Sequence, residues 1–159
     1  MTPQQPVRAY LGLGSNLGDR KAHLLTALSL LTETDGVHVT RTSSFLDNPA
    51  VGGPAEAPAF LNSVAEIETT IGPHLLLQRL MEIEQALGRE RRVKWEPRVI
   101  DLDILLYGDQ IISSDDLVIP HPLLHERRFV LAPLAEVAPD AIHPVLQMTA
   151  KGLLDNLNG

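Results

Sequence analysis

Apolar and polar positions near the start of the chain predict a strand followed by a helix. Val7 to Leu13 has the pattern of a short strand. A turn rich in small residues follows it, and either Ser15 or Asn16 is expected to cap the next helix. Gly36 is expected to end that helix. The helix presents an apolar stripe made of Leu24, Leu25, Leu28 and Leu31.

Two further strands and a second helix follow. Val37 to Leu46 is rich in β-branched residues, and Phe60 to Ile71 alternates well enough to be another strand. The loop between them is too long for a simple turn and holds Asn48, Pro49, Gly52, Gly53, Pro54 and Pro58. Gly72-Pro73 is typical of a helix start, and Gly88 of a position just beyond a last turn. The apolar face of this helix consists of Leu76, Leu80, Ile83 and Leu87.

The segment from Pro97 to Leu106 has a strand pattern with two carboxylates. Ile100, Leu102, Ile104 and Leu106 are expected to face one way, with Asp101 and Asp103 on the other side. Side chains two apart on a strand lie on one face, roughly 7 Å apart. Two like charges at that spacing need a cation between them, and oxygen ligands suit Mg²⁺ bound to a phosphate substrate. An exposed acidic strand face is the alternative.

The order of these elements predicts the fold class. A β-α-β-β-α-β order with helices on one side of an antiparallel sheet is the ferredoxin-like α+β arrangement. The last fifty or so residues are expected to add a short hairpin and a helix near Leu153. No repeat or long linker interrupts the chain, so residues 1–159 are expected to form a single domain.

Composition and charge narrow the class of ligand. The 159 residues are 44% apolar, which is enough for a real core, and none is a cysteine, so thiolate metal sites and disulfides are excluded. No apolar run is long enough to span a membrane and no signal core is present, so we expect a cytoplasmic protein without a membrane partner. The net charge is −7, yet residues 89–98 carry +3. One basic segment on an acidic chain favours a small anionic ligand over nucleic acid.

The glycine turn after the first strand is similar to loops that bind phosphate. It consists of Gly12, Gly14, Ser15, Asn16 and Gly18. It lacks the Lys-Ser/Thr pair of a P-loop and the acidic residue of a dinucleotide fingerprint. A structural role is therefore the better interpretation of the turn taken alone.

Motifs along nearly the whole chain resemble those of one family, the 6-hydroxymethyl-7,8-dihydropterin pyrophosphokinases. These folate-pathway enzymes move diphosphate from ATP onto a pterin alcohol. The motifs stand in the family's order and near its spacing: Leu13 to Asp19, Ser43 to Phe45, Asn48-Pro49, Val51-Gly52, Phe60 to Asn62, Ile83-Glu84, Gly88-Arg89, Trp95 to Arg98, Asp101 to Asp103, Pro120 to Pro122, Arg127 to Leu131 and Pro133 to Pro139.

The resemblance implies a catalytic set. Asp101 and Asp103 resemble the ligands of two Mg²⁺ ions that bridge the phosphates of ATP. The pterin hydroxyl would attack the β-phosphorus, so AMP would leave. Arg89, Arg91, Trp95 and Arg98 resemble a catalytic loop that closes over the phosphates and is loose without ligand. Arg92 is an alternative to Arg91 as the phosphate contact.

The resemblance also implies contacts to both substrates. The remaining ATP-binding residues would be Glu84, Ile104, His121 and Arg127, with Glu84 at the ribose and the last two at the phosphates. Glu84 could instead be solvated, His121 could be a turn residue, and Arg128 is a rival for Arg127. Phe60 and Phe129 would stack on the pterin while Asn62 binds its edge. The other pterin-binding residues would be Asn48, Pro49 and Val51.

Departures from the family pattern are few. Glu96 stands where glycine or another small residue is usual, Phe60 replaces a frequent tyrosine, and Asn48 replaces a common threonine. The predicted metal ligands Asp101 and Asp103 are kept, so we expect an active enzyme. We also expect the protein to be a monomer. Two rivals remain: a ferredoxin-like nucleic-acid binder, which acidic charge and 4% aromatic residues disfavour, and an inactive regulatory module that binds nucleotide or pterin.

Overall fold

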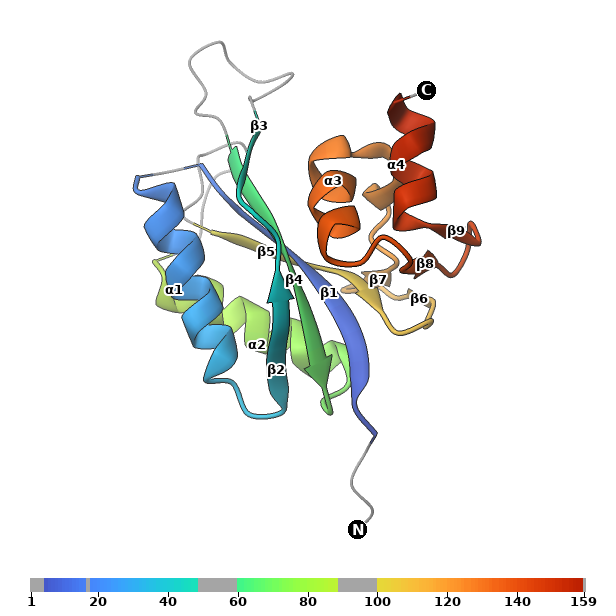
Figure 1. Ribbon diagram of the computed structural model, residues 1–159. Coiled ribbons are helices and arrows are strands. Elements are labelled where there is room, and N and C mark those ends of the chain that lie inside the picture. The colour runs from blue at the N-terminus through green and yellow to red at the C-terminus, as the bar shows by residue number, and fades with distance from the viewer. Residues whose placement is uncertain (1–4, 17, 49–59, 89–99, 159) are drawn as a thin grey trace.

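The structure, a computed structural model, describes residues 5–16, 18–48, 60–88 and 100–158. Helices and strands alternate along the chain (Figure 1). In order they are β1 (Val7–Ser15), α1 (Arg20–Thr32), β2 (Val37–Thr42), β3 (Leu46–Asn48), β4 (Phe60–Thr69), α2 (Pro73–Ala86), β5 (Asp101–Tyr107), β6 (Ile112–Ser113), β7 (Val118–Ile119), the 3₁₀ turn η1 (Leu124–Glu126), α3 (Arg128–Val137), β8 (Ile142–His143), β9 (Met148–Thr149) and α4 (Ala150–Asn158).

The main sheet has the strand order β2-β4-β1-β5, with short β3 also paired to β4. Every pairing in it is antiparallel. The predicted ferredoxin-like arrangement is therefore confirmed. The C-terminal part adds two small hairpins, β6-β7 and β8-β9, and the expected last helix α4.

The sheet separates two hydrophobic cores. Helices α1 and α2 cover one face, where Leu24 and Leu80 pack against strand residues such as Leu11. Helices α3 and α4 lie on the opposite face (Figure 1), where Leu131 and Leu153 pack with another set of strand residues. Only part of that second face is covered by these helices, which leaves its other end for the candidate site.

Helix α1 begins later and ends earlier than expected. Asp19 caps it, because its Oδ1 accepts a hydrogen bond of 3.1 Å from the Ala22 amide. The expectation that Ser15 or Asn16 caps the helix was wrong, since Ser15 is the last residue of β1. Because β1 continues through the predicted glycine turn to Ser15, the helix starts later and Asp19 becomes its N-cap.

Two other expectations for α1 were also wrong. Leu25 is 51% exposed, because Ala27 takes the inward position beside Leu24 and Leu31. The helix ends at Thr32, and Gly36 instead forms the turn into β2 with a φ of 80°. A side chain at Gly36 would lie 2.8 Å from Ile71, so space as well as the backbone requires glycine there.

The segment predicted as one strand from Val37 to Leu46 is divided into β2 and β3. Ser43 lies between them, and its Oγ accepts a hydrogen bond of 2.9 Å from the Val64 amide. A side-chain oxygen thus occupies a position that a backbone carbonyl would hold in a continuous strand. The sheet edge bends at this point.

Strand β5 contains an irregularity that the alternating pattern does not indicate. Leu11 pairs with Ile104, but Tyr10 pairs with Leu106, so Leu105 is an extra residue. Leu102 and Ile104 pack in the first core as predicted, whereas Leu106 packs in the second core. The prediction that Leu106 lies on the same face as Ile100, Leu102 and Ile104 was wrong. The extra residue reverses the alternation of the side chains after Ile104.

No helix in the described ranges is long and apolar enough to cross a membrane.

Candidate functional site

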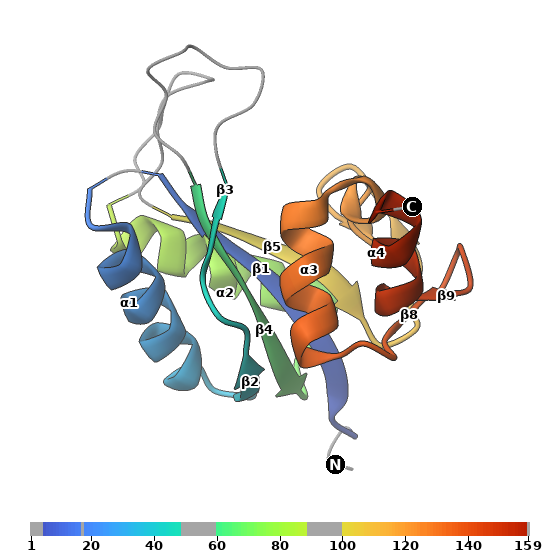
Figure 2. The same ribbon diagram turned by 45° about the horizontal axis from the view of Figure 1, so that its top comes forward.

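The open end of the second sheet face lies where β1 finishes and β4 and β5 begin, and Figure 2 turns this end toward the viewer. Register places Asn62 of β4 opposite Gly14 of β1, and Gly14 opposite Asp101 of β5. One step along, Gly12 lies opposite Asp103. A glycine therefore stands beside each of the two carboxylates.

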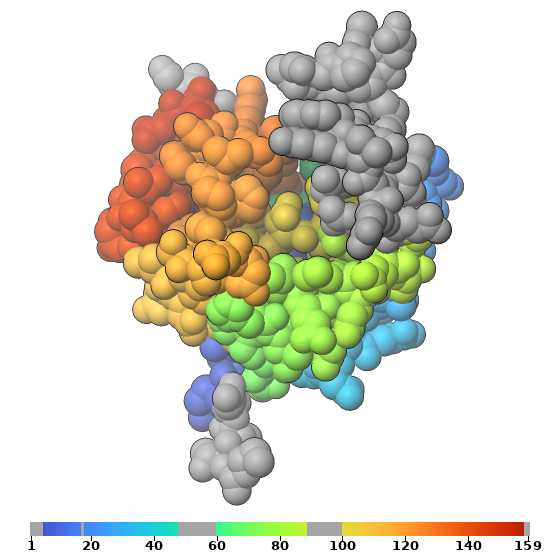
Figure 3. Space-filling view, turned by 180° about the vertical axis from the view of Figure 1, so that it is seen from behind, coloured from blue at the N-terminus to red at the C-terminus, as the bar shows by residue number. Residues whose placement is uncertain are grey.

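The two carboxylates lie on one face of β5, as predicted. Leu102 and Ile104 point into the first core, so Asp101 and Asp103 point to the opposite face. Asp101 is half-buried and Asp103 is exposed. In Figure 3, yellow atoms of β5 reach the surface between α2 in green and the later elements in orange. The pair is thus presented by a rigid strand to solvent or ligand.

The described residues contain no group of three or more His, Cys, Asp or Glu side chains that could hold a metal ion. A pair of carboxylates still suits Mg²⁺, which keeps several waters and takes phosphate oxygens alongside one or two protein carboxylates. The donor set fits an ion that arrives with a phosphate substrate better than a permanent structural ion.

Gly14 leaves the space in which the neighbouring side chains stand. A Cβ there would lie 2.9 Å from Asn62 Nδ2 and 3.4 Å from Phe60 Cδ1. Both neighbours are half-buried residues of β4. The sequence analysis assigned Gly14 to the turn after the first strand and to the family motif from Leu13 to Asp19, without a role in the site. Because β1 continues to Ser15, Gly14 lies inside a strand, where glycine often marks a close approach.

Asn62 carries a buried carbonyl oxygen on its side chain. Among the described residues, nothing donates a hydrogen bond to its Oδ1. A buried carbonyl oxygen without a donor costs free energy, and native proteins rarely tolerate one. A ligand with an N–H group at this position would satisfy it.

Phe129 and Arg127 approach the site from the start of α3. The guanidinium carbon of Arg127 lies 5.7 Å from the centre of the Phe129 ring, and both residues are half-buried. This contact places a cation beside a flat apolar ring. Arg128, the rival for Arg127, is exposed on the first turn of α3.

His121 is influenced by the charges of both Arg127 and Asp101. Its Nδ1 accepts a hydrogen bond of 3.2 Å from the Leu123 amide, so the proton of the neutral ring is on Nε2. Burial lowers the pKa of His121 and the charge of Arg127 lowers it further, while Asp101 acts in the opposite direction. His121 therefore lies within electrostatic reach of both Arg127 and Asp101.

Glu84 is buried, so the interpretation of it as a solvated residue was wrong. It is 5% exposed in α2, and its Oε2 accepts a hydrogen bond of 2.8 Å from the Leu102 amide. This bond fixes β5 between its two aspartates. Ile104, predicted among the nucleotide contacts, has its side chain in the first core and is 4% exposed.

Several predicted site residues cannot be placed. Asn48 pairs with Phe60 in the sheet, although its side chain is not described. The following predicted residues and the expected looseness of the basic loop lie outside the described residues: Pro49, Val51, Arg89, Arg91, Arg92, Trp95, Glu96 and Arg98.

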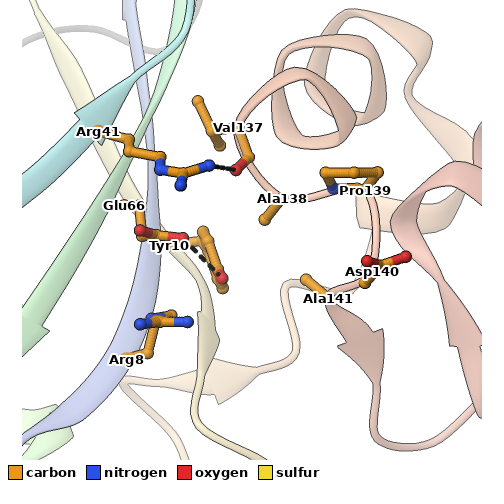
Figure 4. A pocket seen from close by; sticks show the side chains of 9 residues that line it. All are labelled: Arg8, Tyr10, Arg41, Glu66, Val137, Ala138, Pro139, Asp140 and Ala141. Atoms are coloured by element: carbon orange, nitrogen blue, oxygen red, sulfur yellow. Dashed lines mark hydrogen bonds between the residues drawn. The ribbon is translucent and has the colours of Figure 1, made fainter.

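A separate pocket of about 320 Å³ lies under the end of α3 (Figure 4). Its floor holds Tyr10, whose hydroxyl donates a hydrogen bond of 3.0 Å to Glu66. Burial and the charge of Glu66 raise the pKa of Tyr10 to about 12. The rest of the lining is Arg8, Arg41 and Val137 to Ala141. It contains none of the predicted site residues.

Comparison with known proteins gives consistent results. The family model for 7,8-dihydro-6-hydroxymethylpterin-pyrophosphokinase matches residues 10–139. The 2-amino-4-hydroxy-6-hydroxymethyldihydropteridine pyrophosphokinase of Bacillus subtilis is 47% identical over 129 residues, which are 81% of this chain and 77% of that protein. The protein of the same name from Methylorubrum extorquens is 47% identical over 135 residues, 85% of each chain.

Solved structures match in fold. A Plasmodium falciparum HPPK-DHPS crystal structure superposes with a TM-score of 0.75 at 15% identity. The match covers 96% of this chain and 46% of the solved one, so this chain spans less than half of that protein. At this identity the likeness supports the fold alone.

Proposed function

The chain belongs to the 7,8-dihydro-6-hydroxymethylpterin-pyrophosphokinase family, and from this premise we propose how its residues act. It transfers diphosphate from ATP to the hydroxyl of 6-hydroxymethyl-7,8-dihydropterin in folate biosynthesis. The pterin oxygen forms a bond to the β-phosphorus, and the bond from that phosphorus to the oxygen bridging to the α-phosphorus breaks. The hydroxyl proton is released, AMP leaves, and the pterin diphosphate remains.

The observation that carries the residue assignment is the row of Asn62, Gly14 and Asp101 across three adjacent strands. Strands in a sheet are about 4.8 Å apart, so the backbones that carry the amide and the carboxylate are separated by about 10 Å. Gly14, which stands between them, leaves room for the Asn62 amide and the Phe60 ring. The row supports a bound pterin at Asn62 with its reacting arm directed toward phosphates at Asp101.

The pterin half of the site rests on one amide and two rings. The Asn62 acceptor, which has no donor among the described residues, suits an N–H on the edge of the pterin. Phe60 stands beside Asn62 on β4. Phe129 belongs to α3, one of the helices that cover part of the same sheet face. Two rings on different elements can bind the two faces of a flat heterocycle. Asn48, Pro49 and Val51 complete the proposed contacts.

The phosphate half of the site combines negatively charged carboxylates with a positively charged guanidinium. Asp101 and Asp103 would hold two Mg²⁺ ions, which when bound would neutralise phosphate charge and orient the attacking and leaving oxygens. His121 can donate from Nε2, and Arg127 supplies a guanidinium close by. These donors suit phosphate oxygens. Arg89, Arg91, Trp95 and Arg98 are proposed to close over the same phosphates. Glu84 is proposed to contact the nucleoside, and Ile104 to do so through its backbone, because its side chain lies in the first core.

We also propose that the chain works as a monomeric catalytic domain in the cytoplasm. The described residues bury both hydrophobic cores within one chain. Light scattering after size exclusion should give a mass near 17.4 kDa with and without substrates. A larger mass would contradict the monomer.

The reaction is tested by identifying the nucleotide product. The purified protein is incubated with ATP, Mg²⁺ and 6-hydroxymethyl-7,8-dihydropterin, and nucleotides are separated by chromatography. We expect AMP in step with a pterin diphosphate and loss of both with EDTA. Formation of ADP would mean ordinary kinase chemistry. No turnover despite pterin binding would support the inactive module.

A matched variant tests the carboxylate pair. The double substitution Asp101→Asn and Asp103→Asn keeps size and shape but removes both charges. Turnover should fall by at least about 10³-fold, because positioning and charge neutralisation at the phosphates would both be lost. Pterin binding, followed by fluorescence titration, should stay within about threefold of wild type on this reasoning. Unchanged turnover would overturn the metal assignment.

A further inference from the structure

One edge of the sheet is joined to the last turn of α3 by paired hydrogen bonds. The Ser44 amide donates to Glu136 Oε2 at 2.7 Å, and the Ser44 hydroxyl donates to Oε1 at 2.6 Å. We call these two residues the clasp. Next to it, Arg41 Nη1 donates to the Val137 carbonyl at 3.3 Å, as Figure 4 shows. Adjacent residues of α3 thus bind two points near the end of β2.

The clasp joins α3, which carries Phe129, to the segment before β3, the strand that pairs with β4 and therefore with Phe60. Ser44 lies two residues before β3, which pairs with β4 at Phe60 and Asn62. Glu136 stands seven residues after Phe129 on α3, about 10 Å along the helix axis. The position of α3 against β3 and β4 therefore affects the gap between Phe60 and Phe129.

Apolar packing alone does not fix that gap. Leu131 and Leu134 of α3 pack with Val64 of β4 in the second core, which holds the helix on the sheet. Such contacts are not directional, so they oppose lifting of the helix more than its rotation or sliding. Two hydrogen bonds to both oxygens of one carboxylate are directional and charge-assisted. They can set the rotation and register of α3 over the sheet.

We infer that Glu136 is a positioning residue for pterin binding, acting through Ser44 to set the spacing between Phe60 and Phe129. The inference rests on the proposed function, because the two rings matter only if a pterin lies between them. It also gives a role to two sequence segments, Ser43 to Phe45 and Pro133 to Pro139, that the proposed catalytic site leaves unused.

The test compares steady-state constants for AMP formation in clasp variants. Glu136→Ala should raise the KM for the pterin about 3- to 10-fold, with the KM for ATP changed less than about twofold, because the loss concerns pterin binding only. Glu136→Gln keeps an acceptor and adds a donor for the Ser44 hydroxyl, so it should be close to wild type. Ser44→Ala retains the backbone amide and should have the smaller effect.

A matched control and a double variant separate positioning from stability. Glu82→Ala removes another exposed carboxylate, one paired with Arg79 on α2, and should leave both KM values unchanged. Combining Ser44→Ala with Glu136→Ala should raise the pterin KM no further than Glu136→Ala does, because the two residues act as one unit. If Glu136→Ala does not fold, the pterin KM of Ser44→Ala is compared with that of wild type instead.

Each result has one meaning. A wild-type protein that forms AMP, with an unchanged pterin KM in Glu136→Ala, would overturn the inference and leave the proposed function intact. A lower urea midpoint with both KM values unchanged would reduce the clasp to a structural contact and overturn the inference as well. A wild-type protein that forms no AMP would overturn the proposed function, and the inference with it.

Discussion

At the scale of single residues, the absence of a side chain at Gly14 shapes the candidate site as much as the groups around it. Gly14→Ala places a Cβ 2.9 Å from Asn62 Nδ2, so the amide must move away from its position. We expect the KM for the pterin to rise about tenfold or more, since a displaced amide loses its hydrogen bonds to the ligand. Steady-state kinetics of AMP formation measures this.

Gly72→Ala provides the control for that change. No atom of the described residues lies within 4 Å of a Cβ at Gly72, and its backbone is extended with a φ of −69°. Kinetic constants should therefore match those of wild type. An equal rise of KM in both alanine variants would mean that Gly14 acts through general stability and not through Asn62.

Sequence alone predicted the residues that have distinctive chemistry. Asp101 and Asp103 were selected by residue type and spacing and Asn62 through the family resemblance, and the structure places all three on one sheet face. Gly14 and Glu136 were missed as site residues because their roles depend on neighbours 48 and 92 positions away in the chain. A contact of that kind leaves no local pattern in a sequence.

At the scale of elements, Glu84 fixes α2 to the edge strand β5. Glu84→Ala leaves the Leu102 amide without its acceptor and should lower the free energy of unfolding by about 2–3 kcal/mol. Glu84→Gln keeps an oxygen acceptor, so its loss should be below about 1 kcal/mol. Urea unfolding compares the two. Equal losses would show that the negative charge, rather than the acceptor, stabilises the strand.

The start of α1 allows a second comparison at this scale. Asp19→Ala removes the side-chain acceptor of the Ala22 amide and should cost about 1 kcal/mol of stability. Asp19→Asn retains a capping oxygen and should cost only a few tenths of that amount, on the same capping preferences. Thermal unfolding of both variants checks this. A similar loss in both would indicate that the charge at the helix start dominates over the hydrogen bond.

Element types followed from local pattern, while their ends and irregularities did not. The apolar stripe of α2 and the alternation of β5 up to Ile104 predicted which face each element buries. The extra residue Leu105 depends on how β5 pairs with β1, and the break at Ser43 depends on a hydrogen bond to Val64. Both are set by a partner strand distant in the sequence.

At the scale of the whole molecule, stability should depend on pH through His143. This residue of β8 is 6% exposed, and its Nδ1 accepts hydrogen bonds from the amides of Val145 and Leu146 at 3.3 and 3.1 Å. Burial lowers the pKa of His143, and His125, whose ring lies edge-on at 6.1 Å, lowers it further. The neutral ring is therefore the form that the folded chain favours.

The free energy of unfolding should fall as the pH falls, because His143 binds a proton more tightly in the unfolded chain than in the folded one. Between the lowered pKa of folded His143 and the ordinary value of about 6.5, the unfolded chain binds more protons than the folded one. The stabilising contribution of the neutral ring is thus complete above about pH 6.5 and is lost as the pH falls below it. Urea unfolding at several pH values from 7.5 to 5 should show His143→Gln losing less stability on acidification than wild type. Glutamine can still accept a hydrogen bond from the turn, so the difference reports the proton. Parallel curves for the two proteins would contradict the prediction, because the other titrating groups are common to both.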